Sequence, residues 1–392
     1  MPSFGDNDPA ARLPPPPPQA QAHSARLVER IAARIDADGG VIGFDEFMRM
    51  ALYEPGLGYY SGAAPKFGAD GDFVTAPEIS ELFGFCLAQQ CEALVTQGCV
   101  PAILEFGAGS GRLCAQLLRA MPQLERYFIL DLSADLRRRQ HQFLRQALDA
   151  DLFHKIEWLD RLPCDFDGIV LANEVLDAMP VRLLRKDEAW MELGVGYDGT
   201  NLDWHVRAAD GEALATMLEI EARHGELPAG YATELNLNYA PWLAALAAAC
   251  REAVVLIIDY GYEQSQYYHP GRGRGTLNCH YRHRVHDAPL LFPGLQDITA
   301  FVDFDACADA AEAQGFRVSG LARQGAFLVA NGLLDEAQRR AEGAEPIAQM
   351  ALSQQVATLT LPQEMGEKFK VLALQKNLAL ELPALRGGGP FG

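Results

Sequence analysis

The segment ILEFGAGSGRL, residues 103 to 113, joins an apolar run to glycines at alternate positions. Gly107, Gly109 and Gly111 can adopt positive φ and let the backbone approach a ligand closely, and a helix after them offers N–H groups at its first turn. The segment predicts a ligand-binding loop between a strand and a helix, although a glycine-rich loop can also be purely structural. The dinucleotide fingerprint G-x-G-x-x-G would require glycine at Arg112 or Cys114, so the spacing disfavours NAD.

Acidic residues end the next two apolar segments. Asp131 lies 24 positions after Gly107, where a carboxylate can accept both hydrogen bonds of a ribose diol. The alternative is that Asp131 caps the helix expected after it, but Ser133 already suits that task. Asp160 ends the second of these segments, where a ligand contact and a solvated turn are both open.

The segment FDGIVLANEVLDAMPV, residues 166 to 181, places polar residues directly after another apolar run. Ligands of open α/β sheets lie beyond the carboxyl ends of the strands, so we expect Asn173, Glu174 and Asp177 to reach the reacting centre. Helix capping is the alternative role for Asn173. If the substrate presents a guanidinium group, the carboxylates of Glu174 and Asp177 can hold it through charged hydrogen bonds.

A glycine-rich loop followed by a helical pattern makes up residues 58 to 90, GYYSGAAPKFGADGDFVTAPEISELFGFCLAQQ. Thr75 and Glu78 fit a capping box, and Pro77 falls in the first turn, where its missing N–H is tolerated. A long loop that leads polar groups to a helix N-terminus predicts a lid over a binding site.

Short apolar segments alternate with helical patterns from Pro101 onward. Strands are expected at 103 to 106, 127 to 130, 156 to 159, 169 to 172 and 254 to 258. This alternation predicts a parallel sheet with helices on both faces. An antiparallel excursion over 182 to 206 and helices ending at Ala249 separate the fourth strand from the fifth, and the last strand is expected over 369 to 374.

The chain divides into five segments by its pattern. Residues 1 to 24, with prolines at 14 to 18, are expected to be a disordered tail. Residues 25 to 100 form a helical cap and lid, with two amphipathic helices that meet at Gly39 and Gly40. The cofactor-binding half of the core follows over 101 to 180, an insertion on the acceptor side over 181 to 250, and the second half of the core over 251 to 392.

A loop over 261 to 300 is expected to bind the acceptor or close the site. It contains His280, His283 and His286, which invite a metal interpretation. No cysteine or carboxylate pattern completes a familiar site, so no metal is expected.

Composition narrows the function classes. The 392 residues carry a net charge of −19 and are 49% hydrophobic, which suits a chain with a sizeable core and disfavours nonspecific binding to nucleic acid. No apolar run approaches the roughly 20 residues of a membrane span. Eight cysteines without CxxC spacing fit a reducing compartment. The composition, rich in Ala, Arg and Leu without a targeting segment, favours a bacterial chain, so we expect the cytoplasm, with the mitochondrial matrix as the alternative for a eukaryotic chain.

Several motifs together resemble the MidA-type family of class I methyltransferases, which includes the mitochondrial arginine methyltransferase of respiratory complex I assembly. They are GDFVTAPEIS (71 to 80), LEFGAGSGRL (104 to 113), LANEVLDAMPV (171 to 181), DYG (259 to 261), RGTL (274 to 277), LQDITAFVDF (295 to 304) and PQEMGEKFKVLAL (362 to 374). The resemblance implies an α/β fold of the Rossmann-like class I type: a mostly parallel seven-stranded sheet with a helical N-terminal extension and an inserted acceptor-side region.

The same resemblance implies the cofactor S-adenosyl-L-methionine and a protein arginine as acceptor. Together with the residues argued from spacing, it gives a candidate cofactor site of Glu105, Gly107, Ala108, Gly109, Gly111, Asp131, Asp160, Asn173, Thr75, Glu78 and Ser80. Asp72 would belong to the same lid, and Glu174, Asp177 and Asp259 would be the catalytic residues. One position departs from the family pattern, because the mitochondrial member has histidine in place of Asn173.

Methylation of a protein arginine, with a respiratory complex subunit as a candidate partner, is the function that this pattern favours. Two alternatives stay open. The first is a methyltransferase that acts on a small molecule in a closed pocket, and the second is an assembly chaperone that binds the cofactor without turning it over. The net charge of −19 is compatible with a basic protein substrate.

Overall fold

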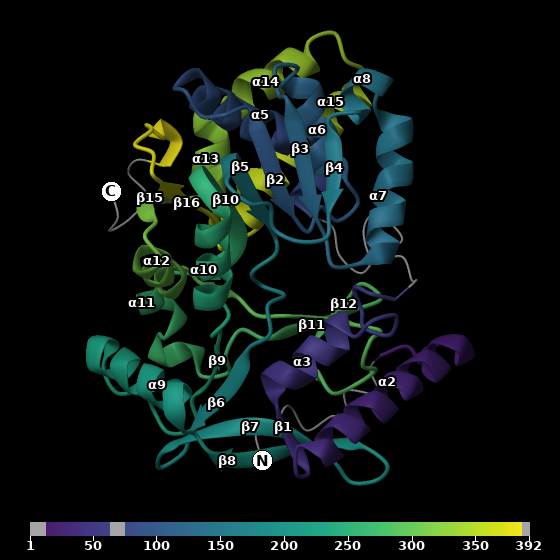
Figure 1. Cartoon of the computed structure of the whole chain (residues 1–392), viewed down its shortest axis with the longest axis vertical. Coiled ribbons are helices and arrows are strands. Elements are labelled where there is room, and N and C mark those ends of the chain that lie inside the picture. The colour runs from purple at the N-terminus through teal and green to yellow at the C-terminus, as the bar shows by residue number, and fades with distance from the viewer. Residues whose placement is uncertain (1–12, 63–74, 386–392) are drawn as a thin grey trace. The chain divides into compact units, whose positions relative to one another are not determined.

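The computed structural model describes residues 13 to 62 and 75 to 385. The chain forms two compact units, each built from segments far apart in sequence. The first unit comprises Met1–Phe73, Asp177–Asn238 and Tyr262–Asp303, and the second comprises Val74–Leu176, Tyr239–Gly261 and Phe304–Gly392. The helical segment predicted over 25 to 100 therefore contributes residues to both units (Figure 1).

A mostly parallel sheet forms the centre of the second unit. Its strands are β2 (Ala102–Phe106), β3 (Arg126–Leu130), β4 (Ile156–Leu159), β5 (Phe166–Asn173), β10 (Cys250–Tyr262), β15 (Arg317–Arg323) and β16 (Phe369–Lys376). They lie in the order β15-β16-β10-β5-β2-β3-β4. The pairs from β10 to β4 are parallel, whereas β16 is antiparallel to both of its neighbours. The strands predicted from the apolar segments are confirmed.

Helices enclose this sheet. They are α4 (Ala76–Ile79), α5 (Glu81–Thr96), α6 (Arg112–Ala120), α7 (Ala134–Ala147), α8 (Ala150–Phe153), α10 (Tyr239–Ala249), α12 (Phe304–Ala313), α13 (Gln324–Ala330), α14 (Leu333–Ala341), α15 (Pro346–Thr360), α16 (Met365–Lys368) and the 3₁₀ turn η2 (Pro383–Leu385). Every residue of β2 is buried, as expected for a parallel strand covered on both faces. Its apolar side chains share one core with those of α5 and α6, and each fully buried leucine there contributes roughly 1.5 to 3 kcal/mol.

The first unit is built on antiparallel strands. They are β1 (Val41–Gly43), β6 (Arg182–Lys186), β7 (Trp190–Tyr197), β8 (Leu202–Ala208) and β9 (Ala232–Leu235) in one sheet, and β11 (Asn278–Tyr281), β12 (Arg284–His286) and β13 (Asp297–Thr299) in another. The short β14 (Val302–Asp303) pairs with β10 as an eighth strand of the mostly parallel sheet, one more than the seven expected. The helical elements are α2 (Pro18–Ala37), α3 (Phe44–Tyr53), α9 (Gly211–His224), α11 (Gln264–Tyr267) and the 3₁₀ turn η1 (Pro270–Arg272). The antiparallel excursion predicted over 182 to 206 is confirmed by β6, β7 and β8.

Two expectations for this unit are wrong. The disordered tail was expected to reach residue 24, but α2 begins at Pro18, because proline is accepted in a first turn and Ser24 and Leu27 are buried. The segment from 261 to 300 was expected to be a loop, yet β11, β12 and β13 pair within it. Its strands have only three or four residues, too short for a clear period-two pattern.

None of the helices in the two described ranges is long and apolar enough to cross a membrane.

Candidate active site

The glycine loop joins β2 to α6 in the second unit. Gly107, Gly109 and Gly111 have φ values of 59°, 53° and 85°, the left-handed region that glycine adopts at little cost. A Cβ atom at Gly111 would lie 3.2 Å from the side chain of Leu144, so packing against α7 also requires glycine there. The N–H groups of the first turn of α6 follow directly, as the sequence predicted.

Asp131 stands at the carboxyl end of β3 with its side chain held from two directions. Its Oδ1 accepts a hydrogen bond from the N–H of Ser133 at 2.9 Å, and its Oδ2 accepts one from Nε2 of Gln140 at 2.8 Å. Ser133, not Asp131, caps α7 by accepting from the N–H of Leu136 at 3.2 Å. Asp131 is half-buried and therefore remains in reach of a ligand.

Leu132, directly after Asp131, is an exposed apolar residue that the sequence argument missed. Its side chain is 83% exposed beside a carboxylate at the end of a parallel strand. A large apolar side chain in this place offers a surface for a flat ring. The signal for it was present, because a leucine stood between a strand and a helix cap, where polar residues prevail.

Asp160 follows β4 and is highly exposed, with 87% of its side chain accessible. Its carboxylate pairs with Arg137 of α7. A solvated ion pair of this kind contributes little to stability, so the position is open to a ligand without a folding penalty.

Glu105, by contrast, is buried on β2 behind the glycine loop. Its Oε2 accepts a hydrogen bond from the hydroxyl of Tyr127 at 2.8 Å. Burial raises the pKa of this carboxyl to about 8, although the Tyr127 hydrogen bond opposes the shift. At neutral pH the Glu105 carboxyl is therefore mostly protonated, and it lies on the strand that leads into the glycine loop.

The predicted capping box at Thr75 and Glu78 is wrong. Thr75 precedes α4 but makes no side-chain cap. Glu78 instead accepts a hydrogen bond from Ser110 of the glycine loop and pairs with Nε of Arg112 at 2.6 Å. A capping box satisfies only local N–H groups, whereas these partners come from another element and offer a full positive charge.

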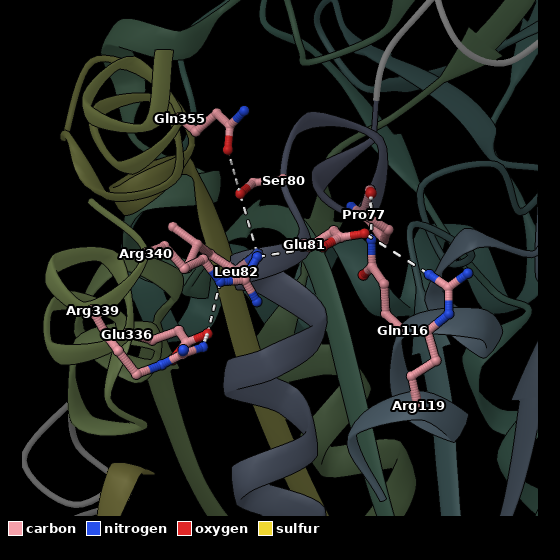
Figure 2. Close-up of polar contacts among 10 residues, drawn as sticks. All are labelled: Pro77, Ser80, Glu81, Leu82, Gln116, Arg119, Glu336, Arg339, Arg340 and Gln355. Carbon is pink, nitrogen blue, oxygen red and sulfur yellow. Dashed lines mark hydrogen bonds and ion pairs between the residues drawn. The ribbon is translucent and has the colours of Figure 1, made fainter. Parts of the chain in front are cut away.

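Further contacts fix the segment around α4, as Figure 2 shows. Nε2 of Gln116 on α6 donates to the carbonyl of Pro77 at 2.9 Å. Ser80 caps α5 by accepting from the N–H of Leu82 at 3.1 Å, and its hydroxyl donates to Gln355 of α15 at 2.7 Å. Asp72 lies outside the described residues. In the described part of the predicted lid, Glu78 therefore contacts the glycine loop, Pro77 contacts α6, and Ser80 contacts α15.

The carboxyl end of β5 carries an unusual backbone. Glu174 has a φ of 53°, in the left-handed region that non-glycine residues seldom adopt. Its N–H donates to the carbonyl of Ile258 at 2.8 Å, which holds this conformation against β10. Its Oε1 accepts from the N–H of Ala76 and from Nδ2 of Asn173, each at 3.3 Å. Strained backbone at the end of a parallel strand is typical of a functional position.

Asp259 supports this turn from β10. It is fully buried, and its Oδ2 accepts from the N–H groups of Val175 at 3.2 Å and Leu176 at 2.9 Å. Its Oδ1 accepts from the N–H of Tyr260 at 2.9 Å. Such an arrangement fits a residue that shapes the backbone after Glu174 better than one that touches an acceptor.

Asp177, the third predicted catalytic carboxylate, belongs to the first unit. It is buried. Burial raises the pKa of Tyr60, and the nearby charges of Asp297 and Asp177 raise it further. The hydroxyl of Tyr60 donates to Oδ1 of Asp297 at 2.8 Å. Asp177 thus lies in a buried tyrosine and carboxylate cluster.

His280, His283 and His286 lie on the β11 and β12 hairpin and its turn. His286 pairs in register with Cys279, and His280 with Val285. Burial lowers the pKa of His286. Over residues 13 to 62 and 75 to 385, no group of three or more His, Cys, Asp or Glu side chains is arranged to hold a metal ion.

The groups at the sheet edge fit S-adenosyl-L-methionine. The glycine loop would take its methionine part, Asp131 its ribose, and Leu132 with Asp160 its adenine. Oδ1 of Asn173 is buried without a hydrogen-bond partner among the described residues, a costly state that a donor on a ligand would relieve. When bound, this cofactor supplies a methyl group on a sulfonium for direct displacement.

Comparison with known proteins supports this fit. In a crystal structure from Burkholderia thailandensis, a protein bound to S-adenosyl-homocysteine shares the fold with a TM-score of 0.88 and 39% identity, over 96% of this chain and 98% of that one. A mitochondrial protein of Drosophila melanogaster named protein arginine methyltransferase NDUFAF7 homolog is 29% identical over 93% of this chain and 89% of its own length. The NDUFAF7 of Danio rerio is 29% identical over 89% and 86%.

A family model described as an S-adenosyl-L-methionine-dependent methyltransferase matches residues 85 to 322, from α5 to β15. This match covers the sheet from β2 to β15, including the strand ends that carry the candidate site. The predicted class I methyltransferase fold and the predicted cofactor are confirmed, while the individual site residues stay predictions. The chain belongs to this family of S-adenosyl-L-methionine-dependent methyltransferases.

Proposed function

We propose that this methyltransferase acts on the arginine side chain of a protein. The observation that carries the proposal is Glu174, a partly exposed carboxylate on a strained turn at the end of β5. A guanidinium is the cation that pairs best with a carboxylate, because its N–H groups match the two oxygens in one plane. The relatives named protein arginine methyltransferase add support, at 29% identity over about nine tenths of the chain.

In this proposal Glu174 holds the guanidinium and aims one nitrogen at the methyl group. Methyl transfer of this kind needs little covalent help from the protein, so alignment and exclusion of water supply most of the acceleration. Asp259 acts through the backbone directly after Glu174, since its Oδ2 accepts the N–H groups of Val175 and Leu176. Asn173 and the N–H of Ala76 set the orientation of the Glu174 carboxylate.

The proposed partner is a protein that displays an exposed arginine, with a subunit of a respiratory complex as the first candidate from the family resemblance. The net charge of −19 favours the approach of a basic surface. We propose the bacterial cytoplasm as the place of reaction.

The test is transfer of a labelled methyl group. Purified protein is incubated with methyl-labelled S-adenosyl-L-methionine and a lysate of cells that lack the gene, and labelled proteins are hydrolysed to identify the modified residue. We expect methylarginine with the wild type and none with Gly109→Val, since a β-branched residue does not tolerate the φ of 53° at that position. Glu174→Gln should lower labelling about 100-fold and keep the affinity for S-adenosyl-homocysteine within about threefold.

The matched control is Glu157→Gln, which makes the same substitution at an exposed residue of β4 that pairs only with Arg126 in the described structure. It should label like the wild type. If only small molecules carry the label, the methyl acceptor is a small molecule and not a protein. Cofactor binding without any label would instead support an assembly chaperone.

A further inference from the structure

Gln140 of α7 is a fully buried polar residue that the sequence argument passed over. It lies between Leu136 and Leu144 on the buried stripe of the helix, where an apolar side chain is the norm. Its Nε2 donates to Oδ2 of Asp131 at 2.8 Å and to the carbonyl of Gly109 at 3.1 Å. Its Oε1 accepts from Nε1 of Trp158 at 3.1 Å.

These three hydrogen bonds fix the orientation of the amide. A glutamine side chain has two N–H donors on nitrogen, and both have acceptors here, in Asp131 and Gly109. The indole N–H of Trp158 can only donate, so it must face the amide oxygen. A flipped amide would place a donor against the indole and an oxygen against two acceptors. The observed orientation is therefore the only one that satisfies the hydrogen bonds of all four groups.

The amide also joins three segments of the cofactor site. Gly109 belongs to the glycine loop, Asp131 ends β3, and Trp158 lies on β4. A lysine or arginine in place of Gln140 would cancel the charge of Asp131, whereas a neutral amide orients the carboxylate and leaves its charge for a ligand. The carbonyl of Gly109 is held by the same nitrogen, so the loop and the carboxylate are set relative to one another.

We propose that Gln140 is a positioning residue for S-adenosyl-L-methionine, which orients the carboxylate of Asp131 and the backbone of Gly109 for binding. The inference rests on the proposed ribose role of Asp131. It is independent of the identity of the methyl acceptor.

The first experiment measures the affinity of the full chain for S-adenosyl-homocysteine by titration calorimetry. Gln140→Leu keeps a side chain of similar size on the buried stripe of the helix and removes all three hydrogen bonds. Hydrogen bonds to charged groups are among the stronger ones, so the dissociation constant should rise about 10- to 100-fold. Turnover at saturating cofactor should fall much less than affinity, which places the effect in binding.

Gln90→Leu is the matched control. Gln90 is a second buried glutamine of the same unit, on α5, and its Nε2 has no hydrogen-bond partner among the described residues. The substitution removes a buried amide of the same size without touching the cofactor site. Its affinity should stay within about threefold of the wild type, and an equal loss in both variants would assign the effect to general packing and overturn the proposal.

A double-mutant cycle separates positioning from a structural role. Asp131→Ala should weaken binding by itself, and Gln140→Leu should then add less than about threefold in the Asp131→Ala background. An undiminished effect in that background would show that Gln140 does not act through Asp131, which overturns the proposal. If Asp131→Ala leaves affinity unchanged, the ribose role itself fails, and that outcome is distinct from a failure of Gln140.

Trp158→Phe keeps the test decisive if Gln140→Leu does not fold. It removes the indole donor that orients the amide and keeps an aromatic ring at this half-buried position. We expect binding of S-adenosyl-homocysteine to weaken about three- to tenfold, with the same dependence on Asp131. Unchanged affinity would overturn the proposal.

Discussion

The two halves of the sheet edge hold their acidic residues in different ways. At the end of β3, the side chain of Gln140 and one N–H group hold the carboxylate of Asp131. At the ends of β5 and β10, the direction is reversed, because the carboxylate of Asp259 accepts three backbone N–H groups and holds the main chain. At β3 the surrounding protein orients the carboxylate of Asp131, whereas at β5 and β10 the carboxylate of Asp259 fixes the conformation of the main chain.

The backbone conformations follow the same division. The loop beside Asp131 obtains its positive φ values from glycines, at little cost. The turn after β5 places Glu174 in the left-handed region, which costs about 1 kcal/mol for a residue with a Cβ. That strain is tolerated where the side chain itself is needed, so the difference indicates a position selected for its carboxylate.

The largest expected effect is the loss of stability in Asp259→Ala. Three N–H groups, one buried and two part-buried, would lose their acceptor. Each unsatisfied group costs about 1 to 3 kcal/mol, and water that enters the site recovers part of this cost. We expect the free energy of unfolding to fall by about 4 kcal/mol, measured by urea denaturation.

Asp131→Ala provides the contrast at the other half of the edge. Its carboxylate is half-buried, and the N–H that it accepts belongs to Ser133, only two residues further on, so the free energy of unfolding should change by less than about 1 kcal/mol while cofactor affinity falls at least tenfold. If the two variants lose stability equally, the proposed division between the halves is wrong.

A second prediction concerns pH and tests Glu105, a buried carboxyl behind the glycine loop. Its pKa rises from an ordinary value near 4.5 to about 8 in the folded chain. The folded state therefore binds more protons than the unfolded state across this window, so the contribution to stability is full below pH 4.5 and is lost as pH rises through 8. Between pH 5 and pH 8 this amounts to about 3 kcal/mol.

Glu105→Gln isolates the effect because it stays neutral at every pH. We expect its urea unfolding curves to show a smaller decline between pH 5 and pH 8 than those of the wild type. The same pH dependence in both proteins would mean that Glu105 is ionised in the folded chain.

The parallel core was predictable because its signals are local and strong. Apolar segments of four or five residues alternate with helical patterns, and each of them is a strand in the structure. Residues 261 to 300 were not predictable in the same way. Their strands have only three or four residues, too short for a periodic trace, and the hairpin of β11 and β12 turns at Arg282 and His283 without the glycine or asparagine that marks a tight turn.

The site was predictable to the level of strand ends, because parallel strands direct their carboxyl ends to one edge. What the sequence could not give was the partner of each side chain. Glu78 was assigned to a capping box from its spacing to Thr75, but the charge of Arg112 outweighs the local N–H group. Gln140 could have been suspected, since a polar residue interrupts the apolar stripe of Leu136 and Leu144.

A third prediction separates strain from chemistry at Glu174. Glu174→Gly relieves the left-handed φ, which offsets the hydrogen bonds lost from Ala76 and Asn173. Stability should therefore change by less than about 1 kcal/mol, while methyl transfer falls about 100-fold.

Asp165→Gly is the matched control, at another non-glycine residue with a positive φ, of 52°, in the exposed turn before β5. The free energy of unfolding of Asp165→Gly should rise by up to about 1 kcal/mol, and its methyl transfer should equal that of the wild type. Loss of activity in both variants would indicate that Glu174 matters for the shape of the chain and not for its carboxylate.

The smallest effect is expected from Gly84→Ala, which tests the segment that touches both halves of the edge. Through α4, Glu78 contacts Ser110 of the glycine loop, and the N–H of Ala76 contacts Glu174. A Cβ atom at Gly84 would lie 2.3 Å from Oε1 of Gln116, whose Nε2 donates to the carbonyl of Pro77.

Alanine normally stabilises a helix interior relative to glycine by about 1 kcal/mol, but here it must displace Gln116. We expect Gly84→Ala to destabilise the chain by about 1 kcal/mol and to weaken binding of S-adenosyl-homocysteine about threefold. Gln116→Ala should weaken binding to the same extent, because it removes the same contact with Pro77. A stabilised Gly84→Ala variant with unchanged affinity would mean that the two halves of the edge bind their ligands independently of α4.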